Sequence, residues 1–234
     1  MCKEAEKLGF RVFIFNSLGR YVKGNAHDKG EINIFNLVNF DLLAGLIILT
    51  ETISHQPTVD RLVSEAKLRN IPVVTVDGRV EGCYNFVLSN SSGFEKIVRH
   101  FVEFHKFSRI AIVSGIPDND VSERRIEIYK KVLLENNIPV REEYIKYGMF
   151  WHIPAQNAAQ ELMQLAEPPE AIVFANDAMA VAAAIRLSEL GFKIPGDVCV
   201  SGFDGLEIAL NHDVPITTAS SAVDSIGIEA VRVI

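Results

Sequence analysis

Short apolar runs alternate with helix-forming segments along almost the whole chain, and this alternation constrains the fold more than any other feature. Most runs are rich in valine, isoleucine and phenylalanine and lack the polar alternation of a half-exposed strand. We therefore expect strands at 11–15, 45–49, 71–76, 85–88, 110–113, 144–147, 171–174, 198–202 and 216–219. Strands that alternate with helices predict doubly wound parallel sheets, either one wide sheet or two smaller ones.

The segments between these runs carry apolar residues at helical spacing. The helix expected after residue 174 also has clear start and stop signals. Asn176 or Asp177 can cap its first turn, Gly191 can end it in the left-handed conformation, and Pro195 blocks its continuation. Further helical periods cover 59–66, 94–102, 126–133 and 158–165.

Charge and cysteine content exclude several classes of protein. The 234 residues include 23 Lys and Arg against 30 Asp and Glu, a net charge of −7, so this stretch is a poor binder of nucleic-acid phosphates. Three widely spaced cysteines (Cys2, Cys83 and Cys199) predict neither a disulfide framework nor a zinc site, and favour a cytoplasmic location. The longest apolar run, 42–49, falls far short of the about 20 residues of a membrane span, and the N-terminal residues lack the apolar core of a signal peptide.

Catalytic signatures are missing from the sequence. It contains no P-loop, no G-x-G-x-x-G, no G-x-S-x-G and no H-E-x-x-H motif. The six histidines are scattered, and the five-residue separation of His100 and His105 is not a metal-binding spacing on an α-helix. We therefore expect no metal and no cofactor, and a binding protein rather than an enzyme.

Two segments near the C-terminus carry a family resemblance. Residues 171–180 read AIVFANDAMA, and residues 189–204 read ELGFKIPGDVCVSGFD. Their order and spacing closely resemble the effector domain of the lactose-repressor (LacI/GalR) family of transcriptional regulators, which has the type I periplasmic-binding-protein fold. The segments IPVVTVD at 71–77, SRIAIVSG at 108–115 and PITT at 215–218 also fit that family in the correct order.

The resemblance implies an α/β fold of two doubly wound parallel-sheet lobes with a ligand cleft between them. Lobe one would be 1–88 plus 223–234, lobe two 89–222, and two crossovers would fall near 88–89 and 220–223. The chain opens where the family has its first helix, so the first strand and a DNA-binding helix-turn-helix would lie outside it.

Candidate ligand-binding residues follow the predicted strands, because ligands of doubly wound sheets bind at the carboxyl ends of the strands. Asp77 and Asp204 can each accept two hydroxyl donors of a sugar, although either could be a turn or capping residue. Arg125 corresponds to the family's ligand-contacting arginine and offers a fork of donors. Its neighbour Arg124 leaves this register ambiguous by one residue.

Aromatic and amide side chains complete the predicted site. Phe150, which matches an aromatic position of the family, and Trp151 suit the flat face of a sugar or a base, or else belong to the core. Asn176 and Asp177 could contact the ligand or cap the helix that they precede.

The resemblance implies a sensor domain that binds a small molecule, most simply a sugar, and regulates transcription. It implies a homodimer, for which Leu62, Ile34 and Leu37 could supply apolar contacts unless they pack on the sheet, and contact with DNA only through a module outside this chain. Alternatives are the same sensor fused to another output such as a diguanylate cyclase, a transporter solute-binding protein and a metabolic enzyme.

Overall fold

The computed structural model describes residues 1–17, 30–53, 55–86, 91–210, 216–220 and 223–234. It divides into two compact units, which we describe separately: unit 1 is Met1–Leu88 with Ala222–Ile234, and unit 2 is Ser89–Ser221. The crossovers expected at 88–89 and 220–223 fall largely on residues outside the described ranges. None of the described helices is both long and apolar enough to cross a membrane.

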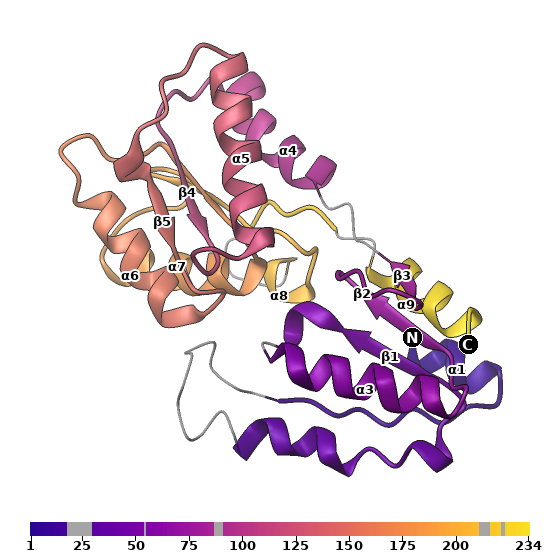
Figure 1. Ribbon diagram of the computed structural model, residues 1–234. Coiled ribbons are helices and arrows are strands. Elements are labelled where there is room, and N and C mark those ends of the chain that lie inside the picture. Colours follow the sequence, from indigo (N-terminus) through magenta and orange to yellow (C-terminus); the bar gives the residue numbers. More distant parts are fainter. Residues whose placement is uncertain (18–29, 54, 87–90, 211–215, 221–222) are drawn as a thin grey trace. The chain divides into compact units, whose positions relative to one another are not determined.

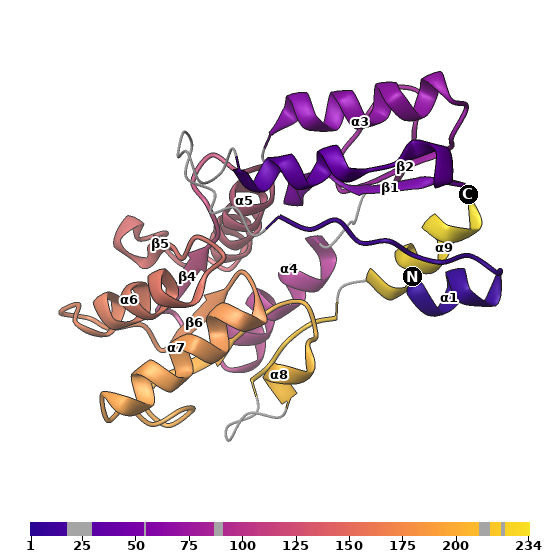
Figure 2. The same cartoon turned by 90° about the horizontal axis from the view of Figure 1, so that it is seen from below.

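Unit 1 contains a three-stranded parallel sheet in the order β1 (Leu46–Leu49), β2 (Val73–Val76) and β3 (Tyr84–Phe86). Helix α3 (Gln56–Leu68) lies on one side of it, and α1 (Cys2–Lys7) and α9 (Val223–Arg232) on the other (Figure 2). The apolar positions of α3 recur at i, i+3, i+4 and i+7 and are buried, which explains why this segment is helical and which face it packs.

Two expected strands are absent or reduced. The strand expected at 11–15 is wrong, because these residues form no regular structure and Phe13 and Ile14 are 65% and 76% exposed. The apolar composition of a segment favours a strand, but it does not reveal whether a neighbouring strand is available for hydrogen bonding. The run at 216–219 has one isolated bridge, from Thr217 to Ser201, and Ser220 just after the run pairs with Asp204 in another.

Unit 2 contains a four-stranded parallel sheet in the order β5 (Ile145–Tyr147), β4 (Ile110–Ser114), β6 (Ala171–Phe174) and β7 (Cys199–Ser201). Alternate residues of β4 and β6 enter two different cores. Ala111, Val113 and Phe174 pack with α6 (His152–Met163) and α7 (Asp177–Glu189), whereas Ile110 and Ile112 pack with α4 (Ser91–Arg99) and α5 (Asp120–Glu135). Helices therefore cover both faces, as expected for a doubly wound sheet (Figure 1).

The residues predicted to start and end a helix after residue 174 do so in α7. The Asn176 side chain caps the helix by accepting a hydrogen bond from the Met179 N–H at 2.8 Å. Gly191 follows the last turn with a φ of +91°, the left-handed conformation that ends many helices. A short helix, α8 (Glu207–Leu210), follows β7.

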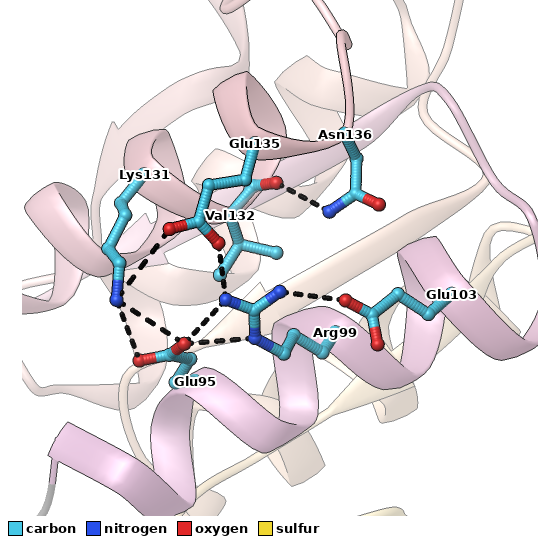
Figure 3. Close-up of polar contacts among 7 residues, drawn as sticks. All are labelled: Glu95, Arg99, Glu103, Lys131, Val132, Glu135 and Asn136. Atoms are coloured by element: carbon cyan, nitrogen blue, oxygen red, sulfur yellow. Dashed lines mark hydrogen bonds and ion pairs between the residues drawn. The ribbon is translucent and has the colours of Figure 1, made fainter.

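A network of charges joins α4 to α5 (Figure 3). The Arg99 guanidinium donates to Glu95 and Glu103, each at 2.7 Å, and to Glu135. Lys131 on α5 reaches Glu95 at 3.3 Å. The network thus links both helices that cover one face of the unit 2 sheet.

Replacing Arg99 with alanine is expected to lower the free energy of unfolding of the protein by about 1 to 2 kcal/mol, because three ion pairs of a network are lost together. Urea unfolding at low salt measures the loss, which should shrink as salt screens the charges. Exposed Lys96 on the same helix provides the control, since Lys96→Ala should change stability little. Equal losses in the two variants would contradict the prediction.

Candidate functional site

The carboxyl ends of the unit 2 strands form one edge, where the connecting loops are tied together by backbone hydrogen bonds. Gly148 N–H donates to Ser114 O at 2.7 Å, and Asp177 N–H donates to Phe203 O at 2.8 Å. These bonds link the loops after β5 and β6 to β4 and to the segment after β7. Side chains that are distant in sequence are thereby held close together.

Arg125 lies in the interior at this edge. Its side chain projects from α5, the residue is only 8% exposed, and its Nη1 donates to the carbonyl oxygen of Ala175 at 2.5 Å. The adjacent Arg124 is exposed. The structure thus shows which of the two arginines turns inward, where the family resemblance left the register ambiguous by one residue.

Three aromatic rings surround the Arg125 guanidinium. Its Cζ lies 4.9 Å from the ring centre of Phe203, 5.7 Å from Phe94 and 5.9 Å from Phe150. Cation–π contacts of this kind favour a charged guanidinium that has lost most of its water. We call Arg125 with these three rings the arginine cage.

Asp204 lies beside the arginine cage. It follows β7, and its N–H donates to Ala219 O at 3.0 Å. Burial raises the pKa of Asp204 to about 6, with the charge of Asp177 acting in the same direction and the Arg125 charge opposing both. Its φ of +118° is unusual for a residue other than glycine, so the backbone is strained at this carboxylate.

Phe150 reaches the cage through an unusual turn. Met149 and Phe150 both have positive φ, at 56° and 51°. The ring covers Gly115 so closely that a Cβ there would lie 2.1 Å from the Phe150 Cζ, which makes glycine necessary for this arrangement. Trp151, in contrast, is 59% exposed and stacks on His152 with ring centres 5.3 Å apart.

Asn176 and Asp177 have defined structural contacts. Asn176 is the cap of α7. Asp177 is fully buried, and its Oδ2 accepts a hydrogen bond from the Leu206 N–H at 2.7 Å, so it fixes the loop that carries Asp204. Burial raises the pKa of Asp177, while hydrogen bonds from Thr218 and from the loop backbone oppose the rise.

Asp77 belongs to unit 1. It directly follows β2 with a φ of +64°, and its N–H donates to Phe86 O at 2.8 Å. Its side chain is half-buried. Asp77 therefore lies at the carboxyl edge of its own sheet, as Asp204 does in unit 2.

Phe94 and Phe203 lie at the site but were not predicted from the sequence, whereas Gly115 was expected at the carboxyl end of its strand. Phe94 lies in a helical apolar period and Phe203 beside an apolar strand, so both are typical of core residues. Only the position of Phe203 next to Asp204 hinted at a second role.

Comparisons with known proteins agree with this architecture. The model of the family described as "Periplasmic binding protein-like domain" matches residues 98–234. The chain is 29% identical over 167 residues to a protein named HTH-type transcriptional repressor PurR of Actinobacillus pleuropneumoniae, covering 70% of the chain and 49% of that protein. It is 25% identical to the probable HTH-type transcriptional repressor ExuR of Bacillus subtilis, covering 83% of the chain and 59% of that protein.

Solved structures show the same fold. A transcription regulator from Lactobacillus plantarum superposes with a TM-score of 0.79 at 18% identity, covering 98% of this chain and 81% of that one. A transcriptional regulator CelR–cellobiose complex gives 0.78 at 22% identity, covering 99% and 68%. The chain spans about half to three fifths of the length of the PurR and ExuR repressors. These matches confirm the resemblance indicated by the motifs at 171–180 and 189–204, and the predicted fold class.

Proposed function

The chain belongs to the periplasmic binding protein-like domain family, and from this membership we propose that it is the ligand-sensing effector domain of a LacI-type transcriptional regulator. The observation that carries the proposal is the buried Arg125 beside the Asp204 carboxylate at the carboxyl edge of a parallel sheet. The names of the repressors that it resembles support a role in transcription.

The ligand is a small polar molecule, most simply a sugar. Ionised Asp204 accepts hydrogen bonds from hydroxyl groups, Arg125 donates to oxygen atoms, and the Phe150 ring offers a flat apolar surface. The cellobiose of the CelR complex supports this class of ligand. Further proposed contacts are Asp77, the exposed Trp151, Asn176 and Asp177. The last two also position their neighbours, since Asn176 caps α7 and Asp177 accepts a hydrogen bond from the Leu206 N–H.

The domain transmits ligand binding by a shift between two conformations. Only a difference in the ligand's affinity for the two conformations can shift that equilibrium. The output is contact with DNA through a module outside this chain, since the chain carries a net charge of −7. The protein would act in the cytoplasm and turn over none of its ligands.

A panel of sugars and other small polar metabolites, tested by thermal unfolding, examines the ligand assignment. A true ligand at 100 times its dissociation constant should add about 2.7 kcal/mol to the free energy of unfolding. The same mixtures, analysed chemically after incubation, should contain only unaltered ligand. A stabilising compound that is converted to product would instead make the protein an enzyme, and a panel without any stabilising compound would contradict the proposed class.

The domain is also proposed to be a homodimer. Of the residues suggested by the sequence, Leu62 packs in the core of unit 1 and Ile34 packs against that core, but Leu37 is 72% exposed. Sedimentation of the purified chain at micromolar concentration should give twice the monomer mass, and Leu37→Glu should shift it toward the monomer. A monomer at high micromolar concentration would contradict the dimer.

A further inference from the structure

The turn that follows α4 brings two histidines together. Residues His100–Phe104 form a π-helical turn, and the backbone N–H of His105 donates to His100 O at 3.2 Å. In an α-helix residues five apart point to different sides, but the wider π turn places residues i and i+5 one above the other. In this π turn, a separation of five residues therefore places the two histidines on the same side, whereas in an α-helix it would argue against a shared metal site.

The two imidazoles face one another through their outer nitrogens. The Nε2 atoms of His100 and His105 are 3.1 Å apart, the ring centres are 4.7 Å apart, and the rings are perpendicular. His105 is exposed and His100 half-buried, so solvent reaches the pair.

Neighbouring phenylalanines hold both rings in place. Phe104 stacks on His100 with ring centres 5.2 Å apart and an interplanar angle of 11°. Phe107 stacks on His105 at 5.2 Å and 18°. Between them, buried Phe101 anchors the turn in the core of unit 2. The arrangement is thus organised before any ligand binds.

The nitrogen separation suits a shared metal ion. Two imidazole nitrogens bound at about 2.0 to 2.1 Å lie about 2.9 Å apart at a right angle and about 3.3 Å apart at the tetrahedral angle. The observed 3.1 Å falls between these values. Imidazole nitrogen is a preferred ligand of zinc, copper and nickel, whereas magnesium and calcium prefer oxygen.

We propose that His100 and His105 form a two-nitrogen binding site for a divalent transition-metal ion such as Ni²⁺, Cu²⁺ or Zn²⁺. Within the described part of the chain, no group of three or more histidine, cysteine, aspartate or glutamate side chains could hold a metal ion. In the proposed site, water or other donors fill the remaining coordination positions. The site is separate from the arginine cage and does not depend on the proposed function.

Calorimetric titration of the whole chain with nickel chloride tests the site. The wild-type protein should bind Ni²⁺ but not Mg²⁺, and His100→Gln and His105→Gln should each weaken Ni²⁺ binding by at least about tenfold, which is about 1.4 kcal/mol. His152→Gln, which removes an exposed histidine elsewhere in unit 2, should leave the affinity unchanged.

Nickel should also raise the melting temperature of the wild-type protein and of His152→Gln, but not that of the other two variants. Circular dichroism shows whether each variant is folded. Failure of the folded wild-type chain to bind Ni²⁺, or equal binding by all variants, would overturn the proposal and reduce the pair to a hydrogen bond between imidazoles.

Discussion

Replacing Asp204 with asparagine is expected to raise the free energy of unfolding at pH 7 by about 2 to 3 kcal/mol, while weakening ligand binding by at least tenfold. Burial raises the pKa of this carboxyl group from 3.8 to about 6, and a shift of one unit corresponds to about 1.4 kcal/mol. Asparagine has nearly the same shape, tolerates positive φ better than most residues, and carries no charge to desolvate. It also replaces one of the two carboxylate oxygens with an NH₂ group, which donates hydrogen bonds and cannot accept one from a hydroxyl group.

The stability gain should depend on pH in a defined direction. The folded protein holds the Asp204 proton more tightly than the unfolded chain does, so this group favours the fold below about pH 4 and that contribution is lost as pH rises through about 6. Wild type and Asp204→Asn should therefore be nearly equal in stability at pH 4 and differ most at pH 7.

Urea unfolding of both proteins across this range, with ligand titrations at pH 7, measures the two effects. Subtracting the free energy of unfolding of wild type from that of the variant at each pH cancels the pH dependence of the other titrating groups. These include Asp177, whose pKa is also raised by burial. If the variant is instead less stable than wild type at pH 7, the attraction between the Asp204 and Arg125 charges stabilises the fold by more than the burial of the Asp204 charge destabilises it. Unchanged ligand affinity would remove Asp204 from the proposed site.

Replacing Arg125 with alanine is expected to lower the free energy of unfolding by about 3 kcal/mol and to weaken ligand binding by at least about tenfold. A charged hydrogen bond to Ala175 O is lost, which typically costs about 1.5 to 3 kcal/mol, and the desolvated contacts with the aromatic rings are worth up to about 2 kcal/mol. The two losses overlap because the same guanidinium makes both contacts.

Arg124→Ala is the matched control, since it removes the same charge and side chain from the next position of α5, where the residue is exposed. It should alter stability by about 0.5 kcal/mol or less. Urea unfolding of both variants measures the difference in stability. Ligand titration at a temperature where both variants are folded separates binding from folding. Equal effects at the two positions would show that the arginine cage is not the ligand site.

The local features of this fold could be predicted from the sequence. Strands β4 and β6 are buried on both faces and appear as largely unbroken apolar runs. Helix α7 begins directly after its cap, Asn176, and ends before Gly191, as these residues indicate. These signals lie within a few residues of the structure that they specify. The expected strand at 11–15 failed because pairing depends on a neighbour that the run itself does not reveal.

The candidate site was predictable only in part. The residue types at positions 125 and 204 indicated a polar binding edge, but not that Arg125 rather than Arg124 turns inward, nor that Phe94 and Phe203 would surround it. The sequence left Asp177 equally open between a ligand contact and a structural role. Its bond from the Leu206 N–H shows a structural contact, and the ligand contact stays a prediction.

The amino-acid sequence by itself determined most of the strands and helices, the ends of α7 and the residue types at the sheet edge, because hydrophobic periodicity and capping act over short distances along the chain. Only the tertiary structure decided the pairing of His100 with His105, the raised pKa of Asp204 and the surroundings of Arg125. The first arises from a π turn that spacing rules for α-helices do not foresee. The pKa of Asp204 and the surroundings of Arg125 depend on burial by segments that are distant in sequence. For example, Arg125 donates a hydrogen bond to the carbonyl oxygen of Ala175, 50 positions further along the chain.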